Sequence, residues 1–166
     1  MSDLLVNKSA SISPCGTWRY RLTRHWAADY MLPFVMLNPS TADAEVDDPT
    51  IRRCMSFARR EGAGGLVVVN LFALRSPSPV RLREVNDPFG PGNAAALKEV
   101  EKYSIRLSVP IVCAWGAHGT FHGGNNAAVR IFQEAGAHLV CLGKTKEGHP
   151  RHPLYVAADQ PLVDFP

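Results

Sequence analysis

The sequence predicts an α/β protein, a three-layer α/β/α sandwich whose central, mainly parallel sheet has four strands. Three observations predict it: four short apolar runs, helical patterns between consecutive runs, and glycine or proline at the junctions. Strands that alternate with helices along a chain are typical of a parallel sheet covered on both faces. The chain has 166 residues, of which 46% are hydrophobic and 20% charged, so a single α/β domain over 1–166 is expected.

The amino-terminal part predicts an edge strand or a small hairpin ahead of this sheet. Thr17–Arg24 alternates large or apolar residues with arginine, after a turn at Pro14-Cys15-Gly16. Alternation of period two is typical of a half-buried strand, so the arginines are expected to face solvent or a ligand. Residues 1–13 show no such pattern, and we expect them to be loosely ordered.

Four apolar runs bounded by turn residues predict the core strands. They are Met31–Leu37, Leu66–Val69, Ile111–Trp115 and His138–Leu142. Asp48-Pro49 supplies an N-cap and a proline in the first helical position, which predicts a helix that ends at Gly62. Two more helices are expected over 93–107 and 125–134, whereas the proline-rich segment 76–91 is expected to be an irregular loop outside the core.

Composition and motifs exclude several classes of protein. No apolar run approaches the roughly 20 residues of a membrane helix. The first residues also lack the pattern of a secretory signal, so we expect a cytoplasmic protein without membrane contact. The net charge of +3 does not by itself indicate nucleic-acid binding. The chain has no Walker loop, G-x-S-x-G or G-x-G-x-x-G motif, and we expect no cofactor.

Polar residues follow the predicted strands, whose carboxyl ends meet at one edge of the sheet, where such sheets bind ligands. Asn38 is held extended by Pro39, so its amide can point into a pocket. Ser40, Thr41 and nearby backbone amides can hold a phosphate or a carboxylate. The alternative is a turn that merely closes the strand.

Asn70 and His152 repeat this placement at other strand ends. The Asn70 amide follows a fully apolar strand and matches the paired donor and acceptor of a pyrimidine edge, although it could instead cap the following loop. His152 precedes a proline, so its ring can reach a leaving group or an oxyanion. Trp115 and Gly116 complete the predicted edge.

Acidic and histidine clusters offer two further interpretations. Asp43 or Asp47 can act as a general base in a pocket that excludes water, while Asp48 is explained as a helix cap. Two histidine pairs invite a metal site, but both lie in glycine- or proline-rich loops and no HExxH motif is present, so we expect no metal. The pairs are His118 with His122 and His149 with His152.

Five motifs are spread over nearly the whole chain: Trp18–Leu22, Asn38–Asp43, Asp47–Thr50, Asn70–Arg75 and His152–Tyr155. Together they resemble the domain-of-unknown-function family 1643, a largely bacterial family. Membership of that family implies no established activity.

More distantly, the order of these segments resembles the uracil-DNA glycosylase superfamily, which implies a four-stranded parallel sheet between helices. Asn38-Pro39 is similar to the Asn-Pro of that superfamily's water-activating loop, which implies that Asn38 positions water. Val67–Asn70 is similar to the base-reading strand, and Ala114–His118 to a Leu-Trp-Gly turn. His152-Pro153 stands where a histidine would approach the base carbonyl oxygen. The aromatic residues available to stack on a base are Phe72 and Trp115.

Three functions remain open from the sequence. The first is a glycosylase-like hydrolase of N-glycosidic bonds, whose partner is a nucleobase, a nucleotide or a nucleic acid. The second is a non-catalytic module that binds the same ligands. The third is an enzyme acting on a small anionic metabolite through Ser40, Thr41 and Arg75.

Overall fold

Four parallel strands form the centre of the sheet, as the apolar runs predict. A computed structural model of the protein describes residues 5–166. The central strands lie in the order β4-β3-β5-β6, and each overlaps its predicted run. They are β3 (Met31–Met36), β4 (Gly65–Asn70), β5 (Ile111–Cys113) and β6 (Leu139–Cys141). Within residues 5–166, no helix is long and apolar enough to span a bilayer.

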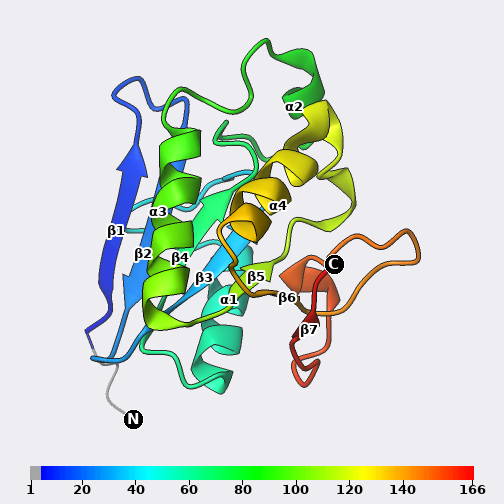
Figure 1. Cartoon of the computed structure of the whole chain (residues 1–166). Coiled ribbons are helices and arrows are strands. Elements are labelled where there is room, and N and C mark those ends of the chain that lie inside the picture. Colours follow the sequence, from blue (N-terminus) through cyan, green and yellow to red (C-terminus); the bar gives the residue numbers. More distant parts are fainter. Residues whose placement is uncertain (1–4) are drawn as a thin grey trace.

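Antiparallel strands extend this centre on both sides, so the sheet is mixed and has seven strands rather than four (Figure 1). β1 (Asn7–Ile12) and β2 (Arg19–His25) form the expected amino-terminal hairpin, and β7 (Val163–Asp164) borders the other edge. We expected residues 1–13 to be loosely ordered; residues 1–4 lie outside the described residues, and β1 pairs along its whole length with β2. Its side chains are mostly exposed, so backbone pairing rather than a burial pattern defines this strand.

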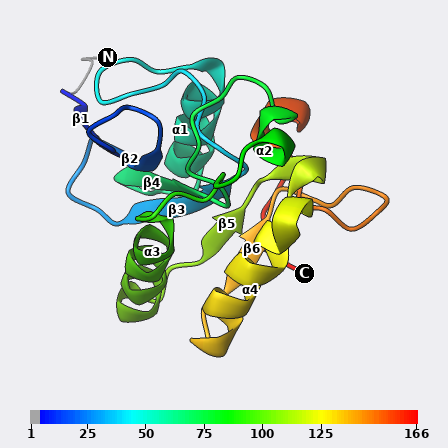
Figure 2. The ribbon, with the colours of Figure 1, turned by 90° about the horizontal axis from the view of Figure 1, so that it is seen from above.

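Helices cover both faces of the sheet (Figure 2). On one face lies α1 (Pro49–Arg60), which begins where predicted because the Asp48 side chain accepts a hydrogen bond from the Ile51 backbone amide at 2.9 Å. The other face carries α3 (Asn93–Leu107) and α4 (Gly124–Glu134). The remaining helical segments are short: α2 (Arg81–Glu84), η1 (Gly116–His118), η2 (Phe121–Gly123) and η3 (Pro153–Tyr155).

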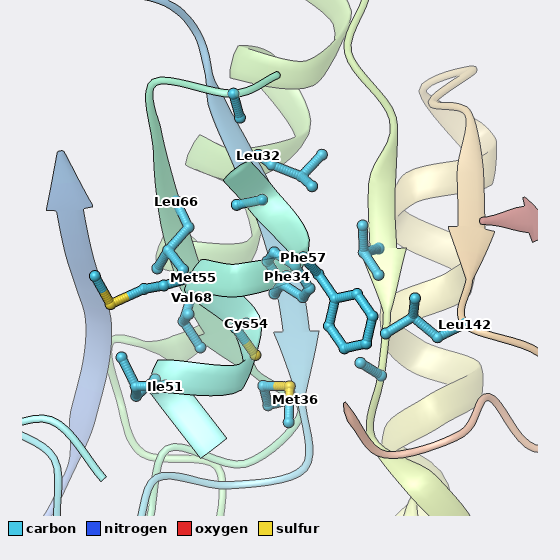
Figure 3. Close-up of a cluster of buried hydrophobic side chains, with 14 of the residues drawn as sticks. Leu32, Phe34, Met36, Ile51, Cys54, Met55, Phe57, Leu66, Val68 and Leu142 are labelled. Atoms are coloured by element: carbon cyan, nitrogen blue, oxygen red, sulfur yellow. The ribbon is translucent and has the colours of Figure 1, made fainter. Parts of the chain in front are cut away.

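Alternating strand residues divide the core into two halves. Leu32, Phe34 and Met36 point from β3 toward the buried face of α1, as Figure 3 shows. Val35, between them, packs in the opposite half with residues of α3 and α4. Because side chains alternate along a strand, the apolar runs buried on both faces are those of central strands.

The proline-rich segment 76–91 contributes to the core, contrary to expectation. Leu82, in α2, is fully buried, and its carbonyl lies 3.0 Å from the His122 ring nitrogen Nε2. Phe89 packs on Phe72 with ring centroids 5.0 Å apart. The prolines correctly indicate turns, but the apolar residues between them anchor the segment on the sheet.

Candidate functional site

A cavity of about 750 Å³ lies at the carboxyl edge of the parallel strands. The chain leaves β3 toward α1 on one face and leaves β5 toward α4 on the opposite face. Diverging connections of this kind open a crevice between two strand ends, which is the usual ligand site of such sheets. Its walls include the strand ends, the start of α1 and the loop between β6 and η3.

Asn70 lies at the end of β4 and lines this cavity. Its side chain is 0% exposed, and neither Oδ1 nor Nδ2 has a hydrogen-bond partner among the described residues. An unpaired buried polar group costs about 1–3 kcal/mol, so such groups are rare in folded proteins. The Asn70 amide is therefore a buried donor and acceptor that no described residue satisfies.

Asn38 also lines the cavity, but most of its hydrogen-bonding capacity is used by the protein. Its Nδ2 donates to the carbonyl oxygens of Pro39, Leu74 and Ser76, at 3.0, 3.2 and 2.9 Å. These contacts fix the side chain and hold the loop after β4 against the loop after β3. The atom of Asn38 that remains for a water or a ligand is Oδ1.

Two buried arginines of β2 hold the loop between β3 and α1. Arg19 donates from Nη1 to the Ala42 carbonyl at 2.8 Å. Arg24 pairs with the Asp47 carboxylate at 2.6 Å and donates to the Asp43 carbonyl at 2.6 Å. Burial raises the pKa of Asp47, but the hydrogen bonds from Arg24 and Lys8 outweigh burial and leave it below its ordinary value. Asp47 is thus an anchor for the loop.

Asp43 is likewise engaged by its own loop. Its Oδ1 accepts hydrogen bonds from the backbone amides of Glu45 and Val46, both at 2.8 Å, and these bonds lower the pKa of the Asp43 carboxyl. This carboxylate does not line the cavity; Asp48 does. The general base expected at Asp43 therefore lies outside the cavity, because the Asx turn directs the side chain into the loop.

His152 approaches the cavity beside the exit of β5. The Gly116 amide donates to the Pro150 carbonyl at 2.9 Å, which ties the last loop to this strand end. Gly116 has a positive φ of 76°, which favours glycine at this turn, while a Cβ there would make an ordinary contact with the His152 Cβ at 3.6 Å. The Leu154 amide donates to His152 Nδ1 at 3.2 Å. That contact assigns the proton of the neutral ring to Nε2.

The charge state of His152 provides a test of this arrangement. Burial lowers the pKa of His152 below its ordinary 6.5, and the nearby Asp48 carboxylate partly offsets that effect. Since the unfolded chain then binds the proton more readily, the free energy of unfolding contributed by this group falls as the pH drops below 6.5. The ring is neutral at pH 7 and can donate from Nε2.

Asp48→Asn is expected to lower the pKa of His152 further, because the substitution removes the charge that raises it. Asparagine caps helices as well as aspartate does, so α1 should remain intact. An NMR titration of the histidine ring protons measures the change. An unchanged or higher pKa of His152 in Asp48→Asn would show that these two groups do not interact.

The structure brings six of the predicted site residues together and separates five from them. Those that line the cavity are Asn38, Ser40, Asn70, Trp115, Gly116 and His152. Those that do not are Pro39, Thr41, Asp43, Phe72 and Arg75. Phe72 packs in the half of the core that contacts α3 and α4 and does not line the cavity, so it is not placed to stack on a ligand there.

Several residues that line the cavity were not among the predicted site residues, among them Arg19, Lys146, Arg151, Leu154 and Tyr155. Arg19 was expected on the solvent or ligand side of a regular strand. Ile12 pairs with Arg19 and Ser11 with Arg21, so Tyr20 is an extra residue that interrupts the alternation of β2. A bulge of this kind leaves no clear signal in a single sequence.

The fold and the cavity define an α/β protein with a cavity at the carboxyl edge of a parallel core. Among residues 5–166, no three His, Cys, Asp or Glu side chains are grouped as metal ligands. The chain belongs to the family described as "Protein of unknown function (DUF1643)", whose model matches residues 19–154, and the sequence resemblance to this family is thereby confirmed. Neither the curated proteins nor the solved structures contain a match to the chain.

Proposed function

We propose that the cavity binds a nucleobase, free or within a nucleotide or nucleic acid, and that the protein hydrolyses its N-glycosidic bond. The observation that carries this proposal is the fully buried amide of Asn70, whose donor and acceptor are both unpaired at the cavity. Such an amide pairs with a base edge that offers one acceptor beside one donor. A ligand of this kind repays the cost of burying the group.

The other cavity residues supply the remaining parts of the reaction. His152 donates from Nε2 to a base carbonyl and stabilises the negative charge that develops on the departing base. Asn38 Oδ1 holds the attacking water. The Asp48 carboxylate, at the start of α1, takes a proton from that water while the oxygen of the water bonds to the sugar carbon. These roles are those of a uracil-DNA glycosylase-like enzyme, and the parallel centre of the sheet between helices supports the comparison.

A non-catalytic base-binding module is the second candidate. The three carbonyls that engage Asn38 Nδ2 give this residue a structural role, and an amide is a poor general base. An enzyme of anionic metabolites has less support. Thr41 and Arg75, two of the three residues predicted for it, lie away from the cavity. The cavity is lined by the cations Arg19, Lys146 and Arg151 as well as by the carboxylates of Asp48 and Glu147.

Calorimetric titration with free bases tests the binding, using Asn70→Leu and, as a matched control, Asn86→Leu at an exposed loop position. Asn70→Leu is expected to weaken binding by about ten- to a hundredfold, the equivalent of two lost hydrogen bonds, and the control by less than about twofold. A protein that binds no base, or binds equally well without the Asn70 amide, contradicts the proposal.

Excision assays with uracil-containing DNA, mismatch-containing DNA and free nucleosides test the catalysis. The wild type is expected to release the free base from at least one of them, whereas His152→Ala and Asp48→Asn lose the release but keep their fold. Binding of a base without release from any substrate would identify the module without turnover.

A further inference from the structure

A second buried polar group lines the same cavity next to Asn70. The Arg19 side chain is 2% exposed, and its Nε–H has no partner among the described residues. Only Nη1 is engaged, by the Ala42 carbonyl at 2.8 Å. The hydrogen bond to Ala42 satisfies Nη1 of the guanidinium, but the buried Nε–H donor of the same charged group is not used.

Sheet topology places the polar groups in a fixed order along the cavity. The antiparallel register that pairs Leu22 with Val68 brings the start of β2, and hence Arg19, beside the end of β4, which carries Asn70. β3 and β5 follow on the other side of β4, and His152 lies against the exit of β5. The order across the edge is therefore Arg19, Asn70, His152.

The order of these three residues matches the order of polar groups along the edge of a base whose carbonyl accepts a hydrogen bond from His152, as the proposed function requires. In this orientation the carbonyl of the base nearest the glycosidic bond lies at His152. The ring nitrogen of the edge then meets Asn70, and the substituent farthest from the sugar points toward Arg19. An amide can present either its oxygen or its nitrogen, so Asn70 alone accepts more than one edge. A guanidinium only donates hydrogen bonds, so Arg19 can pair with a carbonyl oxygen of the base but not with an amino group.

We propose, on the basis of that function, that Arg19 determines specificity: the ligand is an oxo base, with a carbonyl rather than an amino group at the position farthest from the sugar. Uracil-type bases belong to this class, and so do hypoxanthine-type bases, which offer His152 a ring nitrogen as acceptor in place of the carbonyl on the glycosidic side. Cytosine- and adenine-type bases do not belong to it. The electrostatics agree, because burial lowers the pKa of Arg19 to about 10 although the Asp48 charge acts to raise it. A hydrogen-bond acceptor of the ligand would replace part of the hydration that the guanidinium loses when it is buried.

Two pairs of bases that differ mainly by the exchange of oxo for amino provide the probes: uracil against cytosine, and hypoxanthine against adenine. Their dissociation constants are measured by calorimetry for the wild type, Arg19→Lys, Arg19→Gln and Asn70→Leu. Lysine retains a donor-only cation, whereas glutamine offers both a donor and an acceptor. Thermal melting of each variant shows whether loss of the bond to Ala42 affects the fold, and a variant that melts early is compared at lower temperature.

In the wild type the oxo base of at least one pair is expected to bind about ten- to a hundredfold more tightly, as charge-assisted hydrogen bonds imply. Arg19→Lys should keep most of this preference, and Arg19→Gln should reduce it to less than about threefold. Equal binding of both bases by the wild type, or a preference unchanged in Arg19→Gln, overturns the role of Arg19 while base binding through Asn70 stands. If no base binds, the proposed function and this inference both fail.

Discussion

Asn70→Leu is expected to make the unliganded protein more stable by about 1–3 kcal/mol, although it weakens ligand binding. Leucine has nearly the shape of asparagine but leaves no donor or acceptor unpaired among the apolar residues around the end of β4. For a domain of this size the gain corresponds to a rise in melting temperature of about 2–4 °C per kcal/mol. Calorimetric melting in the absence of ligand measures it. A gain in stability that accompanies loss of binding is typical of residues kept for function.

Asn93→Leu is the matched control, since Asn93 is a similarly buried asparagine whose Nδ2 has partners, although its Oδ1 has none among the described residues. Its Nδ2 donates to the carbonyls of Asn70 and Leu71 at 3.0 and 3.1 Å. Its replacement leaves two buried carbonyls without these bonds and is expected to destabilise the protein by about 1–3 kcal/mol. If Asn70→Leu is as destabilising as Asn93→Leu, the Asn70 amide has a structural partner and is not held in reserve for a ligand.

Arg24→Met is expected to lower the free energy of unfolding by about 3–5 kcal/mol, the largest effect anticipated for any substitution discussed. Arg24 is 0% exposed, and its guanidinium joins the Asp47 carboxylate to the carbonyls of Thr23 and Asp43. Removing it leaves the largely buried Asp47 carboxylate with Lys8 but without Arg24, and it leaves the carbonyls without this donor. The loop between β3 and α1, which carries Ser40 and Asp48 to the cavity, should loosen as well.

Arg21→Met provides the control on the same strand. Arg21 pairs with Glu99 at 3.1 Å, but the two side chains are 43% and 64% exposed, and exposed pairs contribute about 0–1 kcal/mol. Urea denaturation compares the two variants, and limited proteolysis shows whether the loop after β3 becomes accessible. A loss below about 1 kcal/mol in Arg24→Met would mean that the loop holds its conformation without the buried pair.

The regular part of the fold could be predicted because its signals are local. Asp48-Pro49 specifies the start of α1 within a few residues, and the continuous apolar runs identify strands that are buried on both faces. β1 could not be predicted in this way. Its stability lies in backbone bonds to β2, and its exposed side chains carry no periodic pattern.

The candidate site was predictable where a residue directly follows a strand, because the topology alone brings such residues to one edge. Asn70, the last residue of β4, and Asn38 and Gly116, which lie two and three residues beyond β3 and β5, were placed at this edge from the predicted strands. The orientation of loop side chains could not be predicted, because it depends on partners that are distant in sequence. Asp43 turns into its own loop, and Phe72 turns to the opposite half of the core beneath Phe89. Arg19 enters the cavity through the irregularity of β2 at Tyr20.

The central claim is that the Asn70 amide pairs with the edge of a base. Its side-chain N–H protons can be observed directly by NMR in protein labelled with ¹⁵N, with Asn70→Leu identifying the resonances. Saturation with uracil or hypoxanthine is predicted to move these two signals downfield and to slow their exchange with water. The account is contradicted if a base binds while the Asn70 signals keep their positions and exchange rates.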